Sequence, residues 1–155
     1  MDMKYMDLAI AQAWAGIKLG HGGPFGAVIV KDGKVVARGH NRVVRNNDPT
    51  QHGEMVAIAN AGRMLGTFDL SGCDLYTTGE PCPMCLCAIK WANIKNVYYG
   101  ATIADNEIIG FRDNIFNEIL SVDRSKLTFN MKELGRDKCL KLFEEYNNMT
   151  DKVNY

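Results

Sequence analysis

The sequence lacks an excess of charge of either sign, because 18 basic and 18 acidic side chains among its 155 residues give a formal net charge of zero. Without a broad positive field to collect polyanions by counterion release, nucleic acids and anionic membranes are not expected as its main partners. It also lacks long apolar runs. The longest stretch of apolar residues and glycine, 25–30, is far shorter than the about 20 residues that span a bilayer, so no membrane-spanning helix is expected.

The N-terminal residues lack a basic region followed by an apolar block, so no signal peptide is expected and the cytoplasm is the predicted location. Five cysteines are an odd number, and the reducing cytosol opposes structural disulfides. We therefore expect the thiols to bind metal or to pack in the core. Apolar residues make up 46% and charged residues 23% of the chain, ordinary globular values that argue against disorder, a collagen-like repeat or a coiled coil.

Hydrophobic periodicity predicts helices that alternate with strands. The predicted helices cover 3–17, about 52–65, 81–91, 114–120 and 136–146, and the predicted strands cover 25–30, 35–39, 75–78, 96–100 and, more weakly, 127–131. The length suits one domain, and no repeat or long linker interrupts it. We therefore expect a single α/β domain over residues 1–155, with α/β/α layers and a mixed sheet of about five strands.

Local signals refine three of these features. The apolar residues of the first helix recur at intervals of three and four, which predicts one apolar stripe made of Met3, Met6, Ile10, Ala13, Trp14 and Ile17. Asp32-Gly33 between two apolar runs predicts a hairpin turn. Asp48-Pro49-Thr50-Gln51 offers an N-cap, a first-turn proline and a capping-box glutamine, so the second helix is expected to begin just before His52.

Four residues form the pattern H-x-E followed by P-C-x-x-C: His52, Glu54, Cys82 and Cys85. The two cysteines have the spacing of zinc ligands, and His52 completes a set of three. Three protein ligands leave the fourth position to water, as a catalytic zinc site requires, whereas a structural site needs a fourth soft ligand and the remaining Cys and His residues are scattered. The sequence therefore predicts one Zn²⁺ per chain. A structural zinc knuckle and a redox-active thiol pair are the alternatives.

We expect Cys82 and Cys85 at a helix N-terminus, where free N–H groups favour thiolates. Two thiolates weaken the Lewis acidity of the metal, so a base is needed beside the water, and Glu54 is the candidate. Positions i and i+2 diverge on a regular helix, so the scheme requires His52 to bend back from the first turn.

Three further Cys and His residues are not expected to bind the metal. Cys87 follows Cys85 by two positions and is expected to point away from the metal as a core thiol. His21 and His40 are expected to lie on the surface.

The paired H-x-E and P-C-x-x-C motifs are the signature of zinc-dependent nucleobase deaminases, and the sequence resembles that cytidine deaminase superfamily from the first helix to Gly100. The finer resemblance is to the bacterial guanine deaminases. It is carried by Gly22-Gly23-Pro24-Phe25-Gly26-Ala27-Val28-Ile29-Val30, Asn41, Asn47-Asp48-Pro49-Thr50, Glu80-Pro81-Cys82-Pro83-Met84-Cys85, Gly110-Phe111, Asp113 and Tyr155. The resemblance implies a cytidine-deaminase-like fold and zinc-dependent hydrolysis of guanine to xanthine and ammonia.

The resemblance also implies which side chains contact the purine: Phe25, Asn41, His52, Trp91, Asp113 and Tyr155. Asn41 is expected to hydrogen-bond the base, while Phe25 and Trp91 wall the pocket. Asp113 is expected to contact the polar edge and assist proton transfer. The family swaps its C-terminal segments, so Tyr155 is expected to close the active site of the neighbouring subunit in a homodimer.

The sequence departs from the family pattern at three sites. Gly53 replaces the usual Ala, Thr78-Gly79 replaces Ser-Cys, and Arg112 replaces an acid beside Asp113. The first two touch the pocket backbone, and the third bears on proton handling. Guanosine, cytosine and adenosine in tRNA are therefore alternative substrates, the last disfavoured by the zero net charge. A different class of function is a non-catalytic zinc domain that binds a protein or a purine and releases no ammonia.

Overall fold

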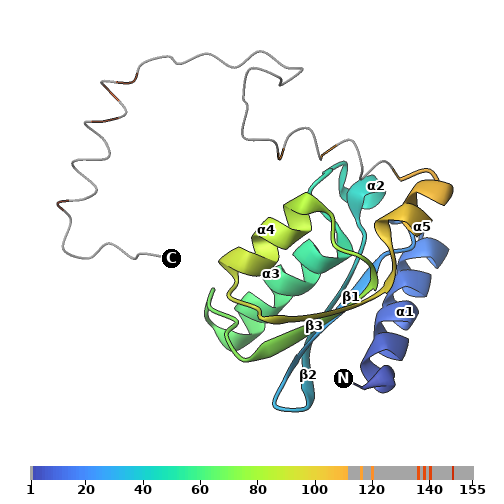
Figure 1. The fold of residues 1–155 in the computed structure, drawn as a ribbon, viewed down its shortest axis with the longest axis horizontal. Coiled ribbons are helices and arrows are strands. Elements are labelled where there is room, and N and C mark those ends of the chain that lie inside the picture. Colours follow the sequence, from blue (N-terminus) through green and yellow to red (C-terminus); the bar gives the residue numbers. More distant parts are fainter. Residues whose placement is uncertain are drawn as a thin grey trace. The chain divides into compact units, whose positions relative to one another are not determined.

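The computed structural model describes residues 2–111 and six further positions, Phe116, Leu120, Arg136, Lys138, Leu140 and Asn148. Contacts within the chain divide it into the units Met1–Phe116 and Asn117–Tyr155. The first unit holds the α/β fold (Figure 1). In the second unit the described residues Leu120, Arg136, Lys138 and Leu140 are helical. The strand predicted at 127–131 lies outside the described residues, as do Asp113 and Tyr155.

A sheet of four strands forms the centre of the first unit (Figure 1). The strands are β1 (Gly26–Lys31), β2 (Lys34–His40), β3 (Cys73–Gly79) and β4 (Asn96–Ala101), in the order β2-β1-β3-β4. β1 pairs antiparallel with β2 and β3, whereas β3 and β4 are parallel. The mixed sheet confirms the predicted fold class, with four strands in the described part where about five were expected.

Helices cover both faces of this sheet. α1 (Met3–Lys18) lies on one face, and α3 (Gly53–Leu65) and α4 (Pro83–Trp91) lie on the other (Figure 1). Because successive strand residues point to opposite faces, β1 contributes to two cores. Ala27 and Ile29 join the core with α3 and α4, while Val28 and Val30 join the core with α1. The expected α/β/α layering follows from this alternation.

The buried face of α1 differs from the predicted apolar stripe. The residues that face the sheet are Tyr5, Ala9, Ala13 and Gly16. Of the predicted stripe, the side chains that are exposed instead are Met3, Ile10, Trp14 and Ile17. The reason is the close approach of helix and strand, since a Cβ built on Gly26 would lie only 2.5 Å from the backbone nitrogen of Ala13. Beyond Tyr5 the packed face is therefore made of small residues, and the larger side chains of Ile10, Trp14 and Ile17 are turned outward.

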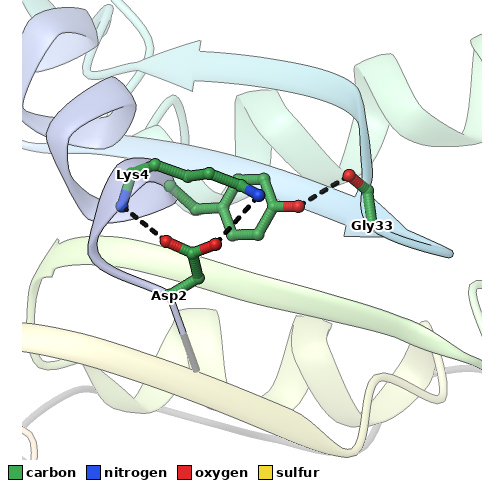
Figure 2. A network of polar contacts seen from close by, with 4 residues as sticks. Asp2, Lys4 and Gly33 are labelled. Atoms are coloured by element: carbon green, nitrogen blue, oxygen red, sulfur yellow. Dashed lines mark hydrogen bonds and ion pairs between the residues drawn. The ribbon is translucent and has the colours of Figure 1, made fainter.

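The start of α1 is tied to the β1–β2 hairpin (Figure 2). The Tyr5 hydroxyl donates a hydrogen bond of 2.6 Å to the carbonyl oxygen of Gly33. Beside it, the Lys4 ammonium lies 2.9 Å from the Asp2 carboxylate. The turn itself has positive φ at both Asp32 (49°) and Gly33 (73°), as a type I′ hairpin turn requires. The Asp-Gly signal thus predicts this hairpin correctly.

The predicted cap at Asp48 is wrong. Its carboxylate accepts hydrogen bonds from the backbone nitrogen (2.8 Å) and hydroxyl (2.7 Å) of Thr50, which closes a local turn, and α3 begins only at Gly53. Two short helices, α2 (Val43–Asn46) and α5 (Ile103–Ile108), are absent from the sequence prediction. Among the described residues no helix combines the length and apolar character needed to cross a bilayer.

Candidate metal and catalytic site

His52, Cys82 and Cys85 come together where α3 and α4 begin. Nδ1 of His52 lies 3.6 Å from the Sγ atoms of both cysteines, and the three candidate ligand atoms lie within 4.8 Å of one another. A tetrahedral zinc with bonds of about 2.0 Å to nitrogen and about 2.3 Å to sulfur needs N···S separations of about 3.5 Å. One imidazole nitrogen and two sulfurs therefore fit zinc, with a fourth position open.

The backbone explains how His52 reaches this cluster. His52 is the N-cap of α3, with φ −66° and ψ 158°, so it is extended rather than helical. Cys82 is the N-cap of α4 in nearly the same conformation, with φ −65° and ψ 166°. Neither side chain caps its own helix. Because His52 stands outside the helix and Glu54 stands in its first turn, the i and i+2 side chains can approach one centre, which is the bend that the sequence pattern required.

The pKa values of the two cysteine thiols are shifted in opposite directions. The hydrogen bond from Cys85, together with His52, lowers the pKa of Cys82 to about 4. The same hydrogen bond, together with burial, raises the pKa of Cys85. Because a metal binds the thiolate form, binding of a divalent ion releases the protons that the two thiols carry.

Glu54 is buried beside this cluster, with only 5% of its surface exposed. Burial raises the pKa of its carboxyl group, and the charge of His52 opposes that shift. Glu54 is not one of the three residues whose ligand atoms form the metal group. A carboxyl group that holds a proton more readily than usual, next to a metal centre but not bound to it, suits a general acid–base.

Phe25 and Asn41 lie beside the segment that carries His52 and Glu54. The Phe25 carbonyl oxygen accepts a hydrogen bond of 2.8 Å from the backbone nitrogen of Asn41, and a Cβ built on Gly53 would lie 2.9 Å from the same oxygen. Asn41 is 4% exposed, and its Oδ1 accepts a 3.1 Å hydrogen bond from the backbone nitrogen of Val43. This bond fixes the orientation of the carboxamide and leaves its NH₂ group as the hydrogen-bond donor.

Trp91 lies at the other end of α4 from Cys82, and its expected role as a pocket wall stays a prediction. Trp91 is the last residue of α4 and is 66% exposed, whereas Cys82 caps the first turn of the same helix. At about 1.5 Å per residue, the two ends are separated by roughly 13 Å. Asp113 and Tyr155 lie outside the described residues, so their expected roles stay predictions.

The expectation that Cys87 is a core thiol is wrong, because its side chain is exposed. α4 buries Cys85 and Ile89, which are four residues apart on one face, and position 87 falls on the opposite side. Cys87 does point away from the metal group, as expected. The helix simply has solvent on that side.

The expectation of two surface histidines is wrong for His40, which is 6% exposed. Its Nε2 lies 2.8 Å from Nδ1 of His21, and the two rings stack with centroids 5.1 Å apart. Burial lowers the pKa of His40, and the Arg42 charge adds to the shift. The pair holds the end of β2 directly before Asn41. No local signal marks it, because the two histidines are distant in sequence.

Comparison with known proteins agrees with the geometry. The family model for the cytidine and deoxycytidylate deaminase zinc-binding region matches residues 1–101. The guanine deaminase of Bacillus subtilis (strain 168) is 40% identical over 151 residues, which are 97% of each chain. The X-ray structure of Bacillus subtilis guanine deaminase superposes with a TM-score of 0.93 at 41% identity, covering 100% of this chain and 99% of that one.

A second kind of relative matches only part of the chain. The tRNA-specific adenosine deaminase of Agrobacterium fabrum is 51% identical over 78 residues, which are 50% of this chain and 51% of that protein. The segments with His52, Glu54, Cys82 and Cys85 all fall inside the family match. The chain therefore belongs to the cytidine and deoxycytidylate deaminase family of zinc-binding proteins.

Proposed function

We propose that this protein catalyses the zinc-dependent hydrolysis of guanine to xanthine and ammonia. The observation that carries the proposal is the buried Glu54 carboxyl group beside a three-ligand His52–Cys82–Cys85 centre. The choice of guanine is supported by the similarity to a guanine deaminase along 97% of the chain, whereas the similarity to the Agrobacterium tRNA-specific adenosine deaminase covers half of it.

In the proposed reaction, His52 and the thiolates of Cys82 and Cys85 hold one Zn²⁺. When bound, the zinc supplies a Lewis acid that makes a water molecule easier to deprotonate. Glu54 accepts a proton from this water as its oxygen attacks C2 of guanine, and then delivers the proton to the amino group that leaves as ammonia. Over the whole reaction the oxygen ends on C2, one proton ends on ammonia and the other on N3 of the ring.

The proposal assigns the purine contacts to Asn41, Phe25, His52 and Asp113. Asn41 presents its NH₂ group to an acceptor on the base, and the Phe25 ring forms an apolar wall. His52 faces the purine with the part of its ring that is not bound to metal. Asp113 is proposed to contact the polar edge of guanine and to assist proton transfer. Trp91, the exposed last residue of α4, is proposed as a second apolar wall.

We further propose that the protein is a cytoplasmic homodimer that acts on a free purine rather than on nucleic acid. In this proposal the C-terminal segment of each subunit, ending in Tyr155, closes the site of the other, as the family resemblance implies. Removing residues 152–155 is expected to abolish turnover while the zinc content stays near one per chain. Full turnover by the shortened protein would refute the swapped segment.

The test of the main proposal is an ammonia assay on zinc-loaded protein with guanine, guanosine, cytosine, adenine and adenosine as separate substrates. Guanine is expected to give ammonia and xanthine at the highest kcat/KM. Ammonia from another substrate alone would overturn the choice of guanine. Tight binding of one zinc and of guanine without ammonia from any substrate would establish the non-catalytic alternative.

A further inference from the structure

We infer that Thr78 and Gly79, at the end of β3, position the Phe25 ring and, through the Phe25 carbonyl group, Asn41, and so determine how tightly the pocket holds its purine. The inference rests on the proposed function, because it concerns the pocket of the same site. Thr78 and Gly79 act through Phe25 and are positioning residues.

The Thr78 hydroxyl holds the backbone on both sides of Phe25. Its Oγ1 accepts a hydrogen bond of 3.1 Å from the backbone nitrogen of Gly26 and donates one of 3.1 Å to the carbonyl oxygen of Pro24. Pro24 and Gly26 are the two chain neighbours of Phe25. A hydroxyl group can donate and accept at once, which a methyl group of the same size cannot do. One side chain on β3 therefore fixes the conformation of the loop that enters β1.

Gly79 leaves room for the ring of Phe25. A Cβ built on Gly79 would lie 3.0 Å from Cε1 and 3.1 Å from Cδ1 of Phe25, which is tighter than ordinary van der Waals contact. Gly79 is not among the glycines with positive φ, so the backbone itself accepts any residue there. Phe111 meets the same ring edge-on, with centroids 4.7 Å apart and an interplanar angle of 85°. The absence of a side chain at position 79 thus sets where the ring lies.

The position of Phe25 is passed on to Asn41 and to the catalytic segment. The Phe25 carbonyl oxygen that accepts the Asn41 N–H also lies close to Gly53, the residue between His52 and Glu54. A shift of Phe25 therefore moves an apolar wall and a hydrogen-bond donor of the pocket together. It changes no metal ligand. We expect the effect to fall on substrate binding more than on zinc content or on the chemical step.

The first test compares two substitutions of Thr78. Thr78→Val keeps the shape but removes both hydrogen bonds, and the KM for guanine is expected to rise about 10-fold, equivalent to about 1.4 kcal/mol. The kcat is expected to change less than the KM, and zinc to stay near one per chain. Thr78→Ser keeps the hydroxyl group and is expected to restore most of the wild-type KM. A role in stability alone would lower thermal stability without this split between KM and kcat.

The second test leaves every hydrogen bond of Thr78 in place. Gly79→Ala crowds the Phe25 ring and is expected to raise the KM for guanine. In a Phe25→Leu background the smaller side chain relieves the crowding, so Gly79→Ala is expected to add little further effect, a coupling that a double-mutant cycle measures. Thr67→Val is the matched control. It removes another threonine hydroxyl, one that accepts a 3.1 Å hydrogen bond from Asp69 after α3, and it should leave the KM unchanged.

The outcomes separate this inference from the proposed function. A wild-type KM in zinc-loaded Thr78→Val, or full additivity of Gly79→Ala with Phe25→Leu, overturns the positioning role. If Thr78→Val does not fold, the Gly79→Ala cycle alone decides. If the wild-type protein binds guanine but releases no ammonia, the proposed function fails, and calorimetric guanine affinities of the same variants replace KM. If it also binds no guanine, both proposals fail.

Discussion

Four of the described helices, α1, α3, α4 and α5, begin in two different ways. α1 and α5 begin after Asp2 and Thr102, whose side chains accept hydrogen bonds from the first backbone N–H groups of their own helices. α3 and α4 begin after His52 and Cys82, which adopt a similar extended backbone but make no capping hydrogen bond. The same structural position thus stabilises a helix in one region and supplies a candidate metal ligand in the other.

This difference lowers the stability of two helix ends and creates a favourable electrostatic environment for the site. A good N-cap side chain contributes about 1 kcal/mol to helix stability, and α3 and α4 both lack it. In exchange, two helix N-termini with free N–H groups and positive dipole ends face one small volume, where they favour thiolate and carboxylate charge. The metal-ligand cluster and Glu54 occupy that volume. The N-termini of α3 and α4, which carry the residues of the proposed chemistry, are therefore less stable than capped helix ends.

The largest expected effect comes from Glu54, the buried carboxyl group in the first turn of α3. Glu54→Gln keeps the shape of the side chain but cannot carry the proton, so kcat for guanine is expected to fall about 10³-fold or more. Zinc content should stay near one per chain, because Glu54 is not among the metal-ligand residues. The measurements are steady-state ammonia release and metal analysis.

Asp7→Asn is the matched control, since it changes an exposed acid on α1. It should keep wild-type turnover. Substantial activity in Glu54→Gln would assign the acid–base role to another group.

A second substitution turns one kind of helix start into the other. Cys82→Ser removes a thiolate ligand but installs a good N-cap residue. In metal-free protein the free energy of unfolding is expected to rise by about 0.5–1 kcal/mol. In the presence of zinc the variant should be less stable than the wild type, because its metal affinity is lost. Urea unfolding with and without a chelator measures the free energy of unfolding in both states, and the change relative to the wild type is expected to have opposite signs.

Cys87→Ser is the control for this pair of measurements, because Cys87 is exposed on the far side of α4. It is expected to match the wild type with and without zinc. A Cys82→Ser protein that is destabilised by the same amount under both conditions would contradict the distinction between ligand and cap.

The contrast between helix starts also explains which features the sequence could predict. The cluster was predictable because H-x-E and P-C-x-x-C specify chemistry through residue type and short spacing. Capping chemistry predicts the start of α3 wrongly, because Asp48 offers a capping side chain, whereas the actual N-cap, His52, makes no capping hydrogen bond. The Thr102–Asp105 capping box of α5 was a readable signal, whereas nothing local indicates α2.

Features that depend on two distant segments were not predictable. The packed face of α1 is determined by the close approach of Gly26 to Ala13. Hydrophobic periodicity alone predicts a stripe of larger side chains instead. The pairing of His21 with His40 joins the end of α1 to the end of β2. The Thr78 hydroxyl reaches across to the loop before β1. In each case the decisive neighbour is supplied by the tertiary fold, which residue spacing along one element does not contain.

A smaller effect is expected when a true cap is removed. Asp2→Ala deletes the hydrogen bond to the Lys4 backbone nitrogen at the start of α1, and the thermal midpoint is expected to fall by about 2–4 °C. Zinc content and kcat should not change, because α1 lies on the opposite face of the sheet from α3 and α4. Calorimetry and the ammonia assay measure the two quantities. Asp2→Asn is the control. It keeps an oxygen acceptor, so its thermal midpoint should fall less.

The smallest expected effect is the acid sensitivity of the α5 cap. Two hydrogen bonds from Thr102 lower the pKa of Asp105 from its ordinary value. The bond from the hydroxyl has the larger effect, and the bond from the backbone N–H has the smaller one. A carboxyl group with a lowered native pKa stabilises the folded state fully above its unfolded pKa of about 4, and this contribution is lost as the pH falls through the lower native value. Titration of the Asp105 carboxyl carbon by NMR should give a value nearer the ordinary one in Thr102→Val.

Thr102→Ser retains the hydroxyl and should keep the lowered pKa of Asp105. Equal pKa values in the Val and Ser variants would show that the backbone N–H, and not the hydroxyl, controls the carboxylate. α4 begins without any carboxylate at its first turn, so its start should show no such carboxylate titration. The pH dependence of the carboxylate therefore distinguishes α5, which is stabilised by its own cap, from α4, whose N-cap Cys82 belongs to the metal-ligand cluster.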